Sequence, residues 1–323
     1  MPKIEKSNFR PKYIFKNRHF NTLYRYFRTN FNIHFNRKRI TTKDNDFLDL
    51  DFSQVGSDSI IIAVHGLEGS SYSSYIQTLT YYFNAKKIDI VALNLRGCSG
   101  ELNKKLPSYH SGKTEDLIDT INYILKNYNY KNIYLVGYSL GGNIVLKYMG
   151  EFANTIPPQI KKAVGVSVPC DLQGAALTIS KKENLLYKKG FLKTLKANAL
   201  EKLKTHPNHQ LDAKKISDAK DFEDFDNAFT APANGFKDAI DYWNKSSCNA
   251  FLPHIKKPSL LISALDDPFL NASCYPFDAA SNNKNFYILA PKYGGHVGFC
   301  ENFKMENNFW LEKQIEKFLF KTI

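Results

Sequence analysis

A serine lies between two glycines at the point where a predicted strand passes into a predicted helix. Residues 137–142 read Gly-Tyr-Ser-Leu-Gly-Gly, after the apolar run 132–136 and before a helix-forming stretch at 143–148. Strand, Gly-x-Ser-x-Gly and helix in this order predict a nucleophile elbow, a turn tight enough to expose the serine hydroxyl. Gly137 and Gly141 remove the side chains that would clash in such a turn. Ser139 is therefore the first candidate nucleophile.

A serine hydroxyl is a weak nucleophile until a base takes its proton, so Ser139 requires a histidine and an orienting carboxylate. Asp266 and Asp267 follow the apolar run 258–264, and His296 follows the short strand predicted at 286–289. All three lie just past the C-terminal ends of predicted strands, where open parallel sheets collect catalytic groups. We predict that His296 is the base and that Asp267 orients it. Asp266 is the alternative carboxylate, although it could instead cap the following turn.

Acyl transfer also requires hydrogen-bond donors for the oxyanion of a tetrahedral intermediate. One predicted donor is the backbone N–H of Leu140, directly after the nucleophile. The other should come from the loop after an earlier strand. Residues 59–64 form that predicted strand and residues 65–70 form the loop, so we assign the second donor to the N–H of Leu67. His65 precedes Ser139 in the chain, and we expect it to shape this loop rather than to transfer protons.

Taken together, these motifs resemble the α/β-hydrolase superfamily. Within it, the chain is similar to the group containing the YheT-type hydrolases, the EMB8-type proteins and a branch of the abhydrolase-domain proteins. The resemblance implies a catalytic triad of Ser139, Asp267 and His296 and the hydrolysis of carboxylic esters, with short-chain or lipid-like acyl groups. The matching stretches are HGLEGSS (65–71), NLRGCSGE (94–101), YHSGKTEDL (109–117), GYSLGGNIVLKYMGE (137–151), SALDDPFL (263–270) and GGHVGF (294–299).

The alternation of predicted strands and helices favours an α/β fold, with a mostly parallel central sheet and helices on both faces. The catalytic core is assigned to residues 56–170 and 251–323. Residues 171–250 exceed what such a core needs, and we predict that they form a helical cap insertion over the site. The aromatic residues of the cap could line an acyl pocket or anchor the cap to the core. Helices are predicted at 72–84, 114–126, 140–152 and 303–320.

Residues 1–55 form a predicted basic arm. Residues 1–43 hold 12 Lys and Arg against a single acidic residue, Glu5, whereas the remaining 280 residues hold 32 basic and 30 acidic groups. Three interpretations are open: packing on the core, attraction to an anionic membrane surface, or, least favoured, binding of nucleic acid. Packing is favoured because residues 30–36 alternate polar and apolar side chains, which predicts a half-buried strand. Its expected antiparallel partner contains Leu48, Leu50 and Phe52.

Composition excludes several other classes of protein. The five cysteines are scattered and include no C-x-x-C pair, which argues against a disulfide framework or a zinc site. The N-terminus lacks the apolar core of a secretory signal. We therefore expect a cytoplasmic protein, peripheral to the inner face of the membrane if the arm contacts lipid. The proposed chemistry requires no metal or organic cofactor, and the oligomeric state is not predicted.

The sequence thus predicts a serine esterase that acts through an acyl-enzyme on a small-molecule or lipid ester. Two alternatives are open. An acyltransferase would use the same triad, with an alcohol or thiol in place of water. A non-catalytic protein associated with membrane or nucleic acid would use the arm for binding and the hydrolase core as a scaffold. Structural roles are expected for His110, as a hydrogen-bonding residue, and for Arg96, as the partner of a carboxylate.

Overall fold

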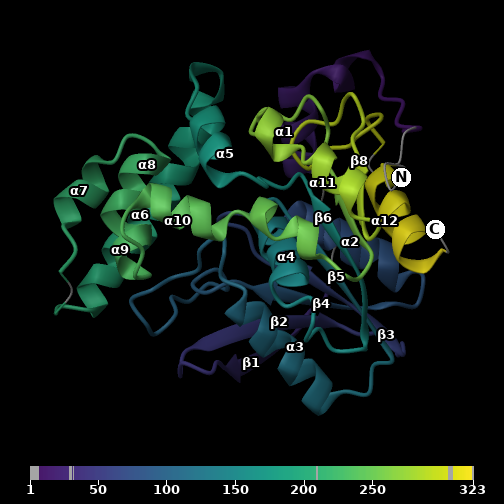
Figure 1. Ribbon diagram of the computed structural model, residues 1–323, viewed down its shortest axis with the longest axis horizontal. Coiled ribbons are helices and arrows are strands. Elements are labelled where there is room, and N and C mark those ends of the chain that lie inside the picture. Colours follow the sequence, from purple (N-terminus) through teal and green to yellow (C-terminus); the bar gives the residue numbers. More distant parts are fainter. Residues whose placement is uncertain (1–6, 29–30, 32, 209, 305–307, 322–323) are drawn as a thin grey trace.

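An eight-stranded sheet forms the centre of the molecule (Figure 1). The computed structural model describes residues 7–28, 31, 33–208, 210–304 and 308–321. The strand order is β1-β2-β4-β3-β5-β6-β7-β8; β2 pairs antiparallel with β1 and β4, and the other neighbours are parallel. The strands are β1 (Asn36–Thr41), β2 (Phe47–Ser53), β3 (Ser59–Val64), β4 (Asp89–Asn94), β5 (Asn132–Tyr138), β6 (Ile160–Val166), β7 (Ser259–Ile262) and β8 (Phe286–Leu289).

Helices cover both faces of this sheet. The central strands are almost continuously apolar because both of their faces are buried. In β3, Ile60 and Ile62 pack with α3 (Glu115–Asn127) and α4 (Leu140–Glu151). Ile61 and Ala63 point the other way and pack with α2 (Ser74–Asn84) and α12 (Trp310–Phe320). A short helix, α11 (Phe277–Asn282), lies on the same side as α3 and α4. The predicted mostly parallel, doubly covered sheet is confirmed.

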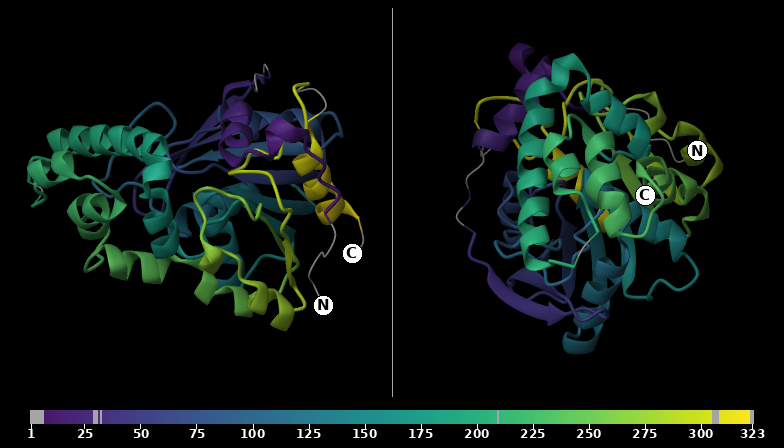
Figure 2. Two further views of the ribbon diagram at one scale, coloured as in Figure 1. Left: turned by 90° about the horizontal axis from the view of Figure 1, so that it is seen from above. Right: turned by 90° about the vertical axis from the view of Figure 1, so that its left-hand side faces the viewer.

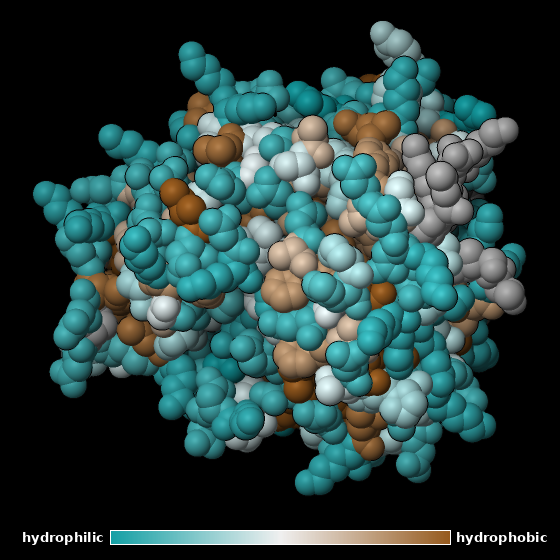
Figure 3. All heavy atoms as spheres, in the orientation of Figure 1, coloured by the Kyte–Doolittle hydropathy of each residue, from teal (hydrophilic) through white to brown (hydrophobic). Residues whose placement is uncertain are grey.

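A helical region between β6 and β7 forms one end of the molecule, on the left in Figure 1, and projects beyond the sheet in the left panel of Figure 2. We call residues 171–250 the cap, as in the sequence prediction. On the face shown in Figure 3, hydrophobic atoms form scattered patches within a mostly hydrophilic surface, some of them over the cap. The cap helices are α5 (Leu172–Ile179), α6 (Leu185–Thr205), α7 (Ala213–Asp218), α8 (Phe222–Phe225), α9 (Ala231–Ala233) and α10 (Ala239–Ser246), with a π-helical turn at Asp226–Thr230.

The N-terminal region is arranged differently from the prediction. Phe31 and Phe35 lie outside any strand; their rings pack against Tyr81 and Tyr72 at the α2 side of the sheet. The alternation that predicted a strand over residues 30–36 therefore reflects aromatic packing, and Asn30 and Asn32 lie outside the described residues. The strand that pairs with β2 is β1, six residues further on. Most of its residues are exposed, and charged side chains make its contacts with the neighbouring strand.

Two basic residues of β1 lie directly opposite acidic residues of β2. Arg37 faces Asp51 and Arg39 faces Asp49 in the strand register, each in a two-pronged ion pair with N–O distances of 2.7–2.8 Å. Opposite charges in facing positions stabilise a strand pair, and the two-pronged geometry is the strong form of this contact. A hydrophobic alternation rule cannot detect such a strand.

The helices near the two ends of the chain also differ from the sequence prediction. α12 begins at Trp310 instead of residue 303; before it, the side chain of Asn308 bonds to the backbone of Glu301 and Asn302. α1 (Arg18–Arg28) was not predicted at all and follows a short 3₁₀ turn at Tyr13–Lys16. None of the helices in the described part of the chain is long and apolar enough to cross a membrane.

Candidate active site

Ser139 occupies the sharp turn between β5 and α4. Its φ of 51° and ψ of −119° lie outside the conformations that non-glycine residues usually adopt. A Cβ atom on Gly137 would come within 3.0 Å of the backbone of Gly141, and one on Gly141 would come equally close to the backbone of Val64 and His65. Both glycines are therefore sterically required where the sequence predicted. The side chain of Ser139 is partly exposed, although its neighbours are buried.

The structure brings His296 together with the predicted aspartate. Nδ1 of His296 lies 2.8 Å from Oδ2 of Asp267. The other carboxylate oxygen, Oδ1, accepts the N–H of Phe269 at 2.9 Å, and the Asp267 side chain is fully buried. A carboxylate can only accept a hydrogen bond, so Nδ1 of His296 carries the proton and donates the hydrogen bond to Asp267. Nε2 is then the ring nitrogen that can accept a proton.

Asp266 is directed to a different group. Its Oδ1 accepts the N–H of Gly295 at 2.9 Å, next to His296 but on the backbone. Burial raises the pKa of Asp266 to about 6. Of the two adjacent carboxylates, Asp267 contacts the imidazole and Asp266 supports the loop that carries it. The sequence placed both residues at the correct strand end, and the structure separates their contacts.

The predicted oxyanion loop lies directly against Ser139. A Cβ atom on Gly66 would lie 3.1 Å from Cβ of Ser139. The loop is tightly turned: the N–H of Gly69 bonds to the carbonyl of Gly66, and the N–H of Glu68 bonds to the hydroxyl of Tyr109. Within the described residues, the N–H groups of Leu67 and Leu140 donate to no protein acceptor. Two free amides beside a nucleophile are what an oxyanion requires.

His65 has the structural role that the sequence analysis expected. Its Nε2 accepts the N–H of Leu95 at 3.0 Å, so its Nδ1 carries the proton and donates to the carbonyl of Gly66 at 2.7 Å. Burial lowers the pKa of His65 to about 4. The imidazole therefore stays neutral at physiological pH, with both nitrogens bonded, and it joins the oxyanion loop to the end of β4.

The structural roles expected for two further residues are also observed. Arg96 forms ion pairs with Asp44, Asp46 and Asp116. Burial lowers the pKa of His110 to about 3, and its Nδ1 accepts the N–H of Gly112 at 3.2 Å. None of these partners belongs to the candidate triad.

The cap contributes apolar side chains near the candidate triad. Leu67 of the oxyanion loop and Phe269, after Asp267, pack against one apolar cluster of the cap. The ring of Phe269 lies 4.5 Å from the imidazole of His296, measured between centroids, and 4.8 Å from the ring of Tyr187 in α6. Tyr242 instead anchors the cap: its hydroxyl bonds to both the N–H and the hydroxyl of Ser111. The buried members of the cluster are Leu172, Ile179, Phe222, Ala231, Ala239, Tyr242, Trp243 and Phe269.

Several residues in contact with the His296 loop were not identified from the sequence. Ser167, at the end of β6, accepts the N–H of Val297 with its hydroxyl at 3.0 Å. Its place at the C-terminal end of a predicted strand was a usable signal. Thr22 of α1 accepts the N–H of His296 at 2.9 Å. No motif surrounds Thr22, so this contact had no sequence signal.

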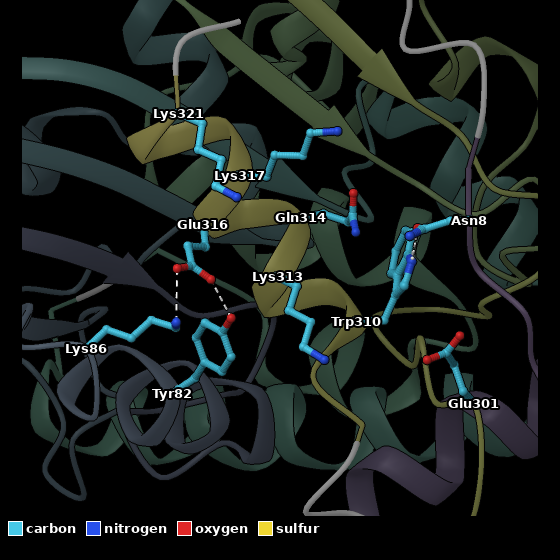
Figure 4. A pocket seen from close by; sticks show the side chains of 10 residues that line it. All are labelled: Asn8, Tyr82, Lys86, Glu301, Trp310, Lys313, Gln314, Glu316, Lys317 and Lys321. Carbon is cyan, nitrogen blue, oxygen red and sulfur yellow. Dashed lines mark hydrogen bonds and ion pairs between the residues drawn. The ribbon is translucent and has the colours of Figure 1, made fainter.

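A surface pocket of about 610 Å³ lies elsewhere on the molecule and contains none of the candidate site residues (Figure 4). It lies against α2 and α12. Within it, Glu316 bonds to the hydroxyl of Tyr82 at 2.5 Å and to Nζ of Lys86 at 3.0 Å. The pocket is rich in lysine, and its lining contains no serine, histidine or aspartate. Its lining residues are Asn8, Tyr82, Lys86, Glu301, Trp310, Lys313, Gln314, Glu316, Lys317 and Lys321.

A mostly parallel sheet with a serine on the β5–α4 turn and an Asp–His pair after β7 and β8 defines the α/β-hydrolase class of protein. The sequence matches the family described as alpha/beta hydrolase fold over residues 59–303. The chain therefore belongs to the α/β-hydrolase family, and the resemblance drawn from its motifs is confirmed.

Individual relatives agree with this assignment. The chain is 33% identical over 287 residues to the "Putative esterase YheT" of Escherichia coli (strain K12), covering 87% of this chain and 84% of that protein. It is 27% identical over 267 residues to the "Monoacylglycerol lipase" of Saccharomyces cerevisiae, covering 80% and 58%. The esterase Pf2001 of Pyrococcus furiosus has a similar structure, with a TM-score of 0.59 at 18% identity over 89% of this chain and 90% of that one. At that identity the likeness concerns the fold.

Proposed function

We propose that this chain is a serine esterase in which Ser139, Asp267 and His296 form the catalytic triad. The contact between His296 and Asp267 carries the proposal, because it leaves Nε2 of the imidazole as the proton acceptor. The relatives named as an esterase and a lipase support the same class. The chain is a carboxylic ester hydrolase, and the roles of its individual residues are the finer part of the proposal.

In the proposed mechanism, Oγ of Ser139 attacks the ester carbonyl while Nε2 of His296 takes its proton. The N–H groups of Leu67 and Leu140 bind the resulting oxyanion, and the N-terminus of α4 adds a favourable dipole there. Collapse of the intermediate expels the alcohol, which receives the proton from His296. Water, activated by His296, then attacks the acyl-enzyme and releases the acid. Asp267 holds the imidazole in the required tautomer throughout.

The apolar side chains beside the site favour an acyl group as the bound portion of the substrate. Leu67 and Phe269 border the site on the core side, and Tyr187 and Phe222 lie in the same apolar cluster of the cap. Such a lining stabilises a hydrocarbon chain by removing it from water, at about 0.8 kcal/mol per CH₂ group. We propose short-chain or lipid-like carboxylic esters as substrates.

Covalent labelling with a fluorophosphonate probe tests the nucleophile. We expect the wild-type chain to be labelled and Ser139→Ala to be neither labelled nor active, with ester turnover lower by several orders of magnitude. Ser217→Ala, at an exposed serine of α7, is the matched control and should behave as wild type. A graded panel of acyl esters run alongside gives the preferred chain length. Labelling that persists in folded Ser139→Ala would contradict the proposal.

An acyltransferase would use the same triad and deliver the acyl group to an alcohol instead of water. Product analysis with an added alcohol separates the two reactions. We expect free acid as the main product, and predominant transfer to the alcohol would favour the alternative.

We also propose that the arm contacts an anionic lipid surface, where an ester substrate could be drawn from the membrane. On α1, the side chains of Leu23, Tyr26 and Phe27 share one outward face and are 39%, 68% and 72% exposed. Exposed basic residues precede the helix, at Arg10, Lys12 and Lys16. Aromatic and basic side chains together suit a membrane interface.

Vesicle flotation tests this contact. We expect the chain to float with phosphatidylserine-containing vesicles and not with neutral ones, and Tyr26→Ser/Phe27→Ser to bind less. Ile240→Ser removes an exposed apolar side chain from the cap and is the control. Equal binding of wild type and the double variant would show that Tyr26 and Phe27 do not contact the membrane, which would contradict the proposal.

A further inference from the structure

The loop that carries His296 has an unusual backbone conformation that needs support from its surroundings. Four of its residues have positive φ angles: Gly294, Gly295, Val297 and Phe299, at 153°, 61°, 58° and 48°. For Val297 and Phe299, which are not glycine, this conformation is strained, and it persists only where the surroundings enforce it. The contacts that enforce it therefore determine where the imidazole lies.

Three consecutive N–H groups of this loop are each bound by a side chain from a different part of the fold. Asp266, after β7, accepts the N–H of Gly295, and Ser167, after β6, accepts that of Val297. The N–H between them belongs to His296 itself and is accepted by Oγ1 of Thr22 in α1. Two of the three supports come from the catalytic core. The third, on the histidine, comes from the N-terminal arm.

The hydroxyl of Thr22 is fixed for this task. It donates its own proton to the carbonyl of Arg18, one helical turn earlier, at 2.7 Å. Its oxygen is then oriented to accept the N–H of His296 at 2.9 Å. The acceptor is therefore held by the helix and does not depend on a free rotamer.

α1 also contacts the loop on both sides of this bond. A Cβ atom on Gly295 would come within 3.0 Å of the carbonyl of Arg18 and the hydroxyl of Thr22, and one on Gly298 equally close to Asn21. Asn21 is fully buried: its Oδ1 accepts the N–H of Cys300, and its Nδ2 donates to the carbonyl of Cys300. The helix and the loop are thus in direct backbone-to-backbone contact.

We propose that α1 is a positioning element of the active site and that Thr22 is the residue through which it acts. Thr22 touches no reacting atom; it fixes the backbone of His296, so that Nε2 is held where Ser139 can use it. This inference rests on the proposed role of His296 as the base. A displacement of about 1 Å in such a group can lower the rate by about 100-fold, so one hydrogen bond on the histidine can govern turnover.

The test compares three substitutions in the full chain. Thr22→Val keeps the shape of the side chain and removes the acceptor, and we expect kcat to fall by about 10- to 100-fold with KM nearly unchanged. Thr22→Ser restores the hydroxyl and should recover activity to within a few-fold of wild type. Thr120→Val in α3 is the matched control, because the Thr120 hydroxyl makes the same bond to the carbonyl one turn earlier and does not contact the loop.

A fluorophosphonate probe separates positioning from folding. The final amount of label counts the folded, competent molecules, whereas the rate of labelling reports the activation of Ser139. We expect Thr22→Val to reach the wild-type amount at a much lower rate. A normal rate with a reduced amount would mean that Thr22 only supports folding. If Thr22→Val does not fold, Thr22→Ala replaces it and the same comparison decides.

The outcomes distinguish this inference from the proposed function. Retained turnover and labelling in Ser139→Ala would overturn the triad itself. Loss of both in Ser139→Ala, with Thr22→Val within twofold of wild type, would overturn only the role of α1.

Discussion

At the scale of single residues, the site depends on which of two adjacent carboxylates contacts the imidazole. Asp267 accepts Nδ1–H of His296, and Asp266 accepts the N–H of Gly295. Both are carboxylates at the end of the same strand, and burial alone does not distinguish a catalytic group from a supporting one. The direction of each side chain gives them different expected effects on the reaction.

Substitution of each aspartate by asparagine tests this assignment. In Asp267→Asn the amide disfavours the required tautomer of His296, and we expect kcat to fall by about 10³- to 10⁴-fold. In Asp266→Asn the amide oxygen can still accept the N–H of Gly295, so we expect kcat to stay within a few-fold of wild type. Steady-state kinetics on one ester measures both. Equal losses in the two variants would contradict the division of roles.

Most residues of this candidate site could be proposed from the sequence because they stand in short motifs at the ends of predicted strands. Ser139, Asp267 and His296 each follow an apolar run, and the parallel topology brings such positions to one edge of the sheet. Asp267 was favoured over Asp266 first by its position in the turn before Pro268 and then by the resemblance, but the sequence left Asp266 as an alternative because side-chain direction after a strand is not encoded in spacing. Thr22 could not be found, because it meets His296 across 274 residues of sequence.

At the scale of elements, the cap contains a buried acid that should make its stability depend on pH. Asp226 lies in the π-helical turn, and its Oδ2 accepts the indole N–H of Trp243 at 2.8 Å. Burial raises the pKa of Asp226 to about 6. Well below pH 4 the carboxyl is protonated in both the folded and unfolded chains. As the pH rises towards 6, the unfolded chain releases the proton first, so the folded state loses stability.

Asp226→Asn removes this titration and keeps an acceptor for Trp243. We expect its free energy of unfolding to match that of wild type near pH 3 and to exceed it above pH 7, by on the order of 2–3 kcal/mol. Urea unfolding at a series of pH values measures the difference. Asp218→Asn, at an exposed acid of α7, should show no such trend. Parallel curves for wild type and Asp226→Asn would mean that Asp226 is not the titrating group.

Element prediction failed where charge or long-range packing replaces hydrophobic periodicity. The core strands were predicted because burial on both faces makes them continuously apolar. β1 was misplaced because its pairing with β2 is made by Arg37 with Asp51 and Arg39 with Asp49. An exposed edge strand held by ion pairs leaves no hydrophobic period to detect.

At the scale of the whole molecule, the excess positive charge of the arm is partly matched by acidic residues elsewhere in the chain. Arg18 pairs with Glu183 of the cap, Arg25 with Glu312 of α12, and Arg39 with Glu101. Together with the pairs between β1 and β2, these contacts join α1 and β1 to the cap, the sheet and the C-terminal helix. Part of the arm's positive charge is therefore neutralised by acidic residues of the same fold. Other basic residues of the arm are exposed and available to contact an external surface.

Substitution of Arg25 and Glu312 tests how much their contact between α1 and α12 contributes to stability. The side chains of both are buried, 2% and 0% exposed, and they form a direct ion pair. Removing one partner leaves a buried charge uncompensated, so we expect Arg25→Met and Glu312→Leu each to lower the free energy of unfolding by about 3–5 kcal/mol. Replacing both with apolar groups removes both charges, and the double variant should recover most of that loss.

A double-mutant cycle measured by urea unfolding gives the coupling between the two positions. If the pair joins the arm to α12, the loss in the double variant will be much smaller than the sum of the single losses. Additive losses would instead mean that each side chain is stabilised by other contacts. Because Arg25 also donates to the carbonyl of Gly298 at 3.4 Å, labelling of Ser139 in the double variant adds a second readout. Recovered stability with slowed labelling would show that the arm supports the fold and the histidine loop through separable contacts.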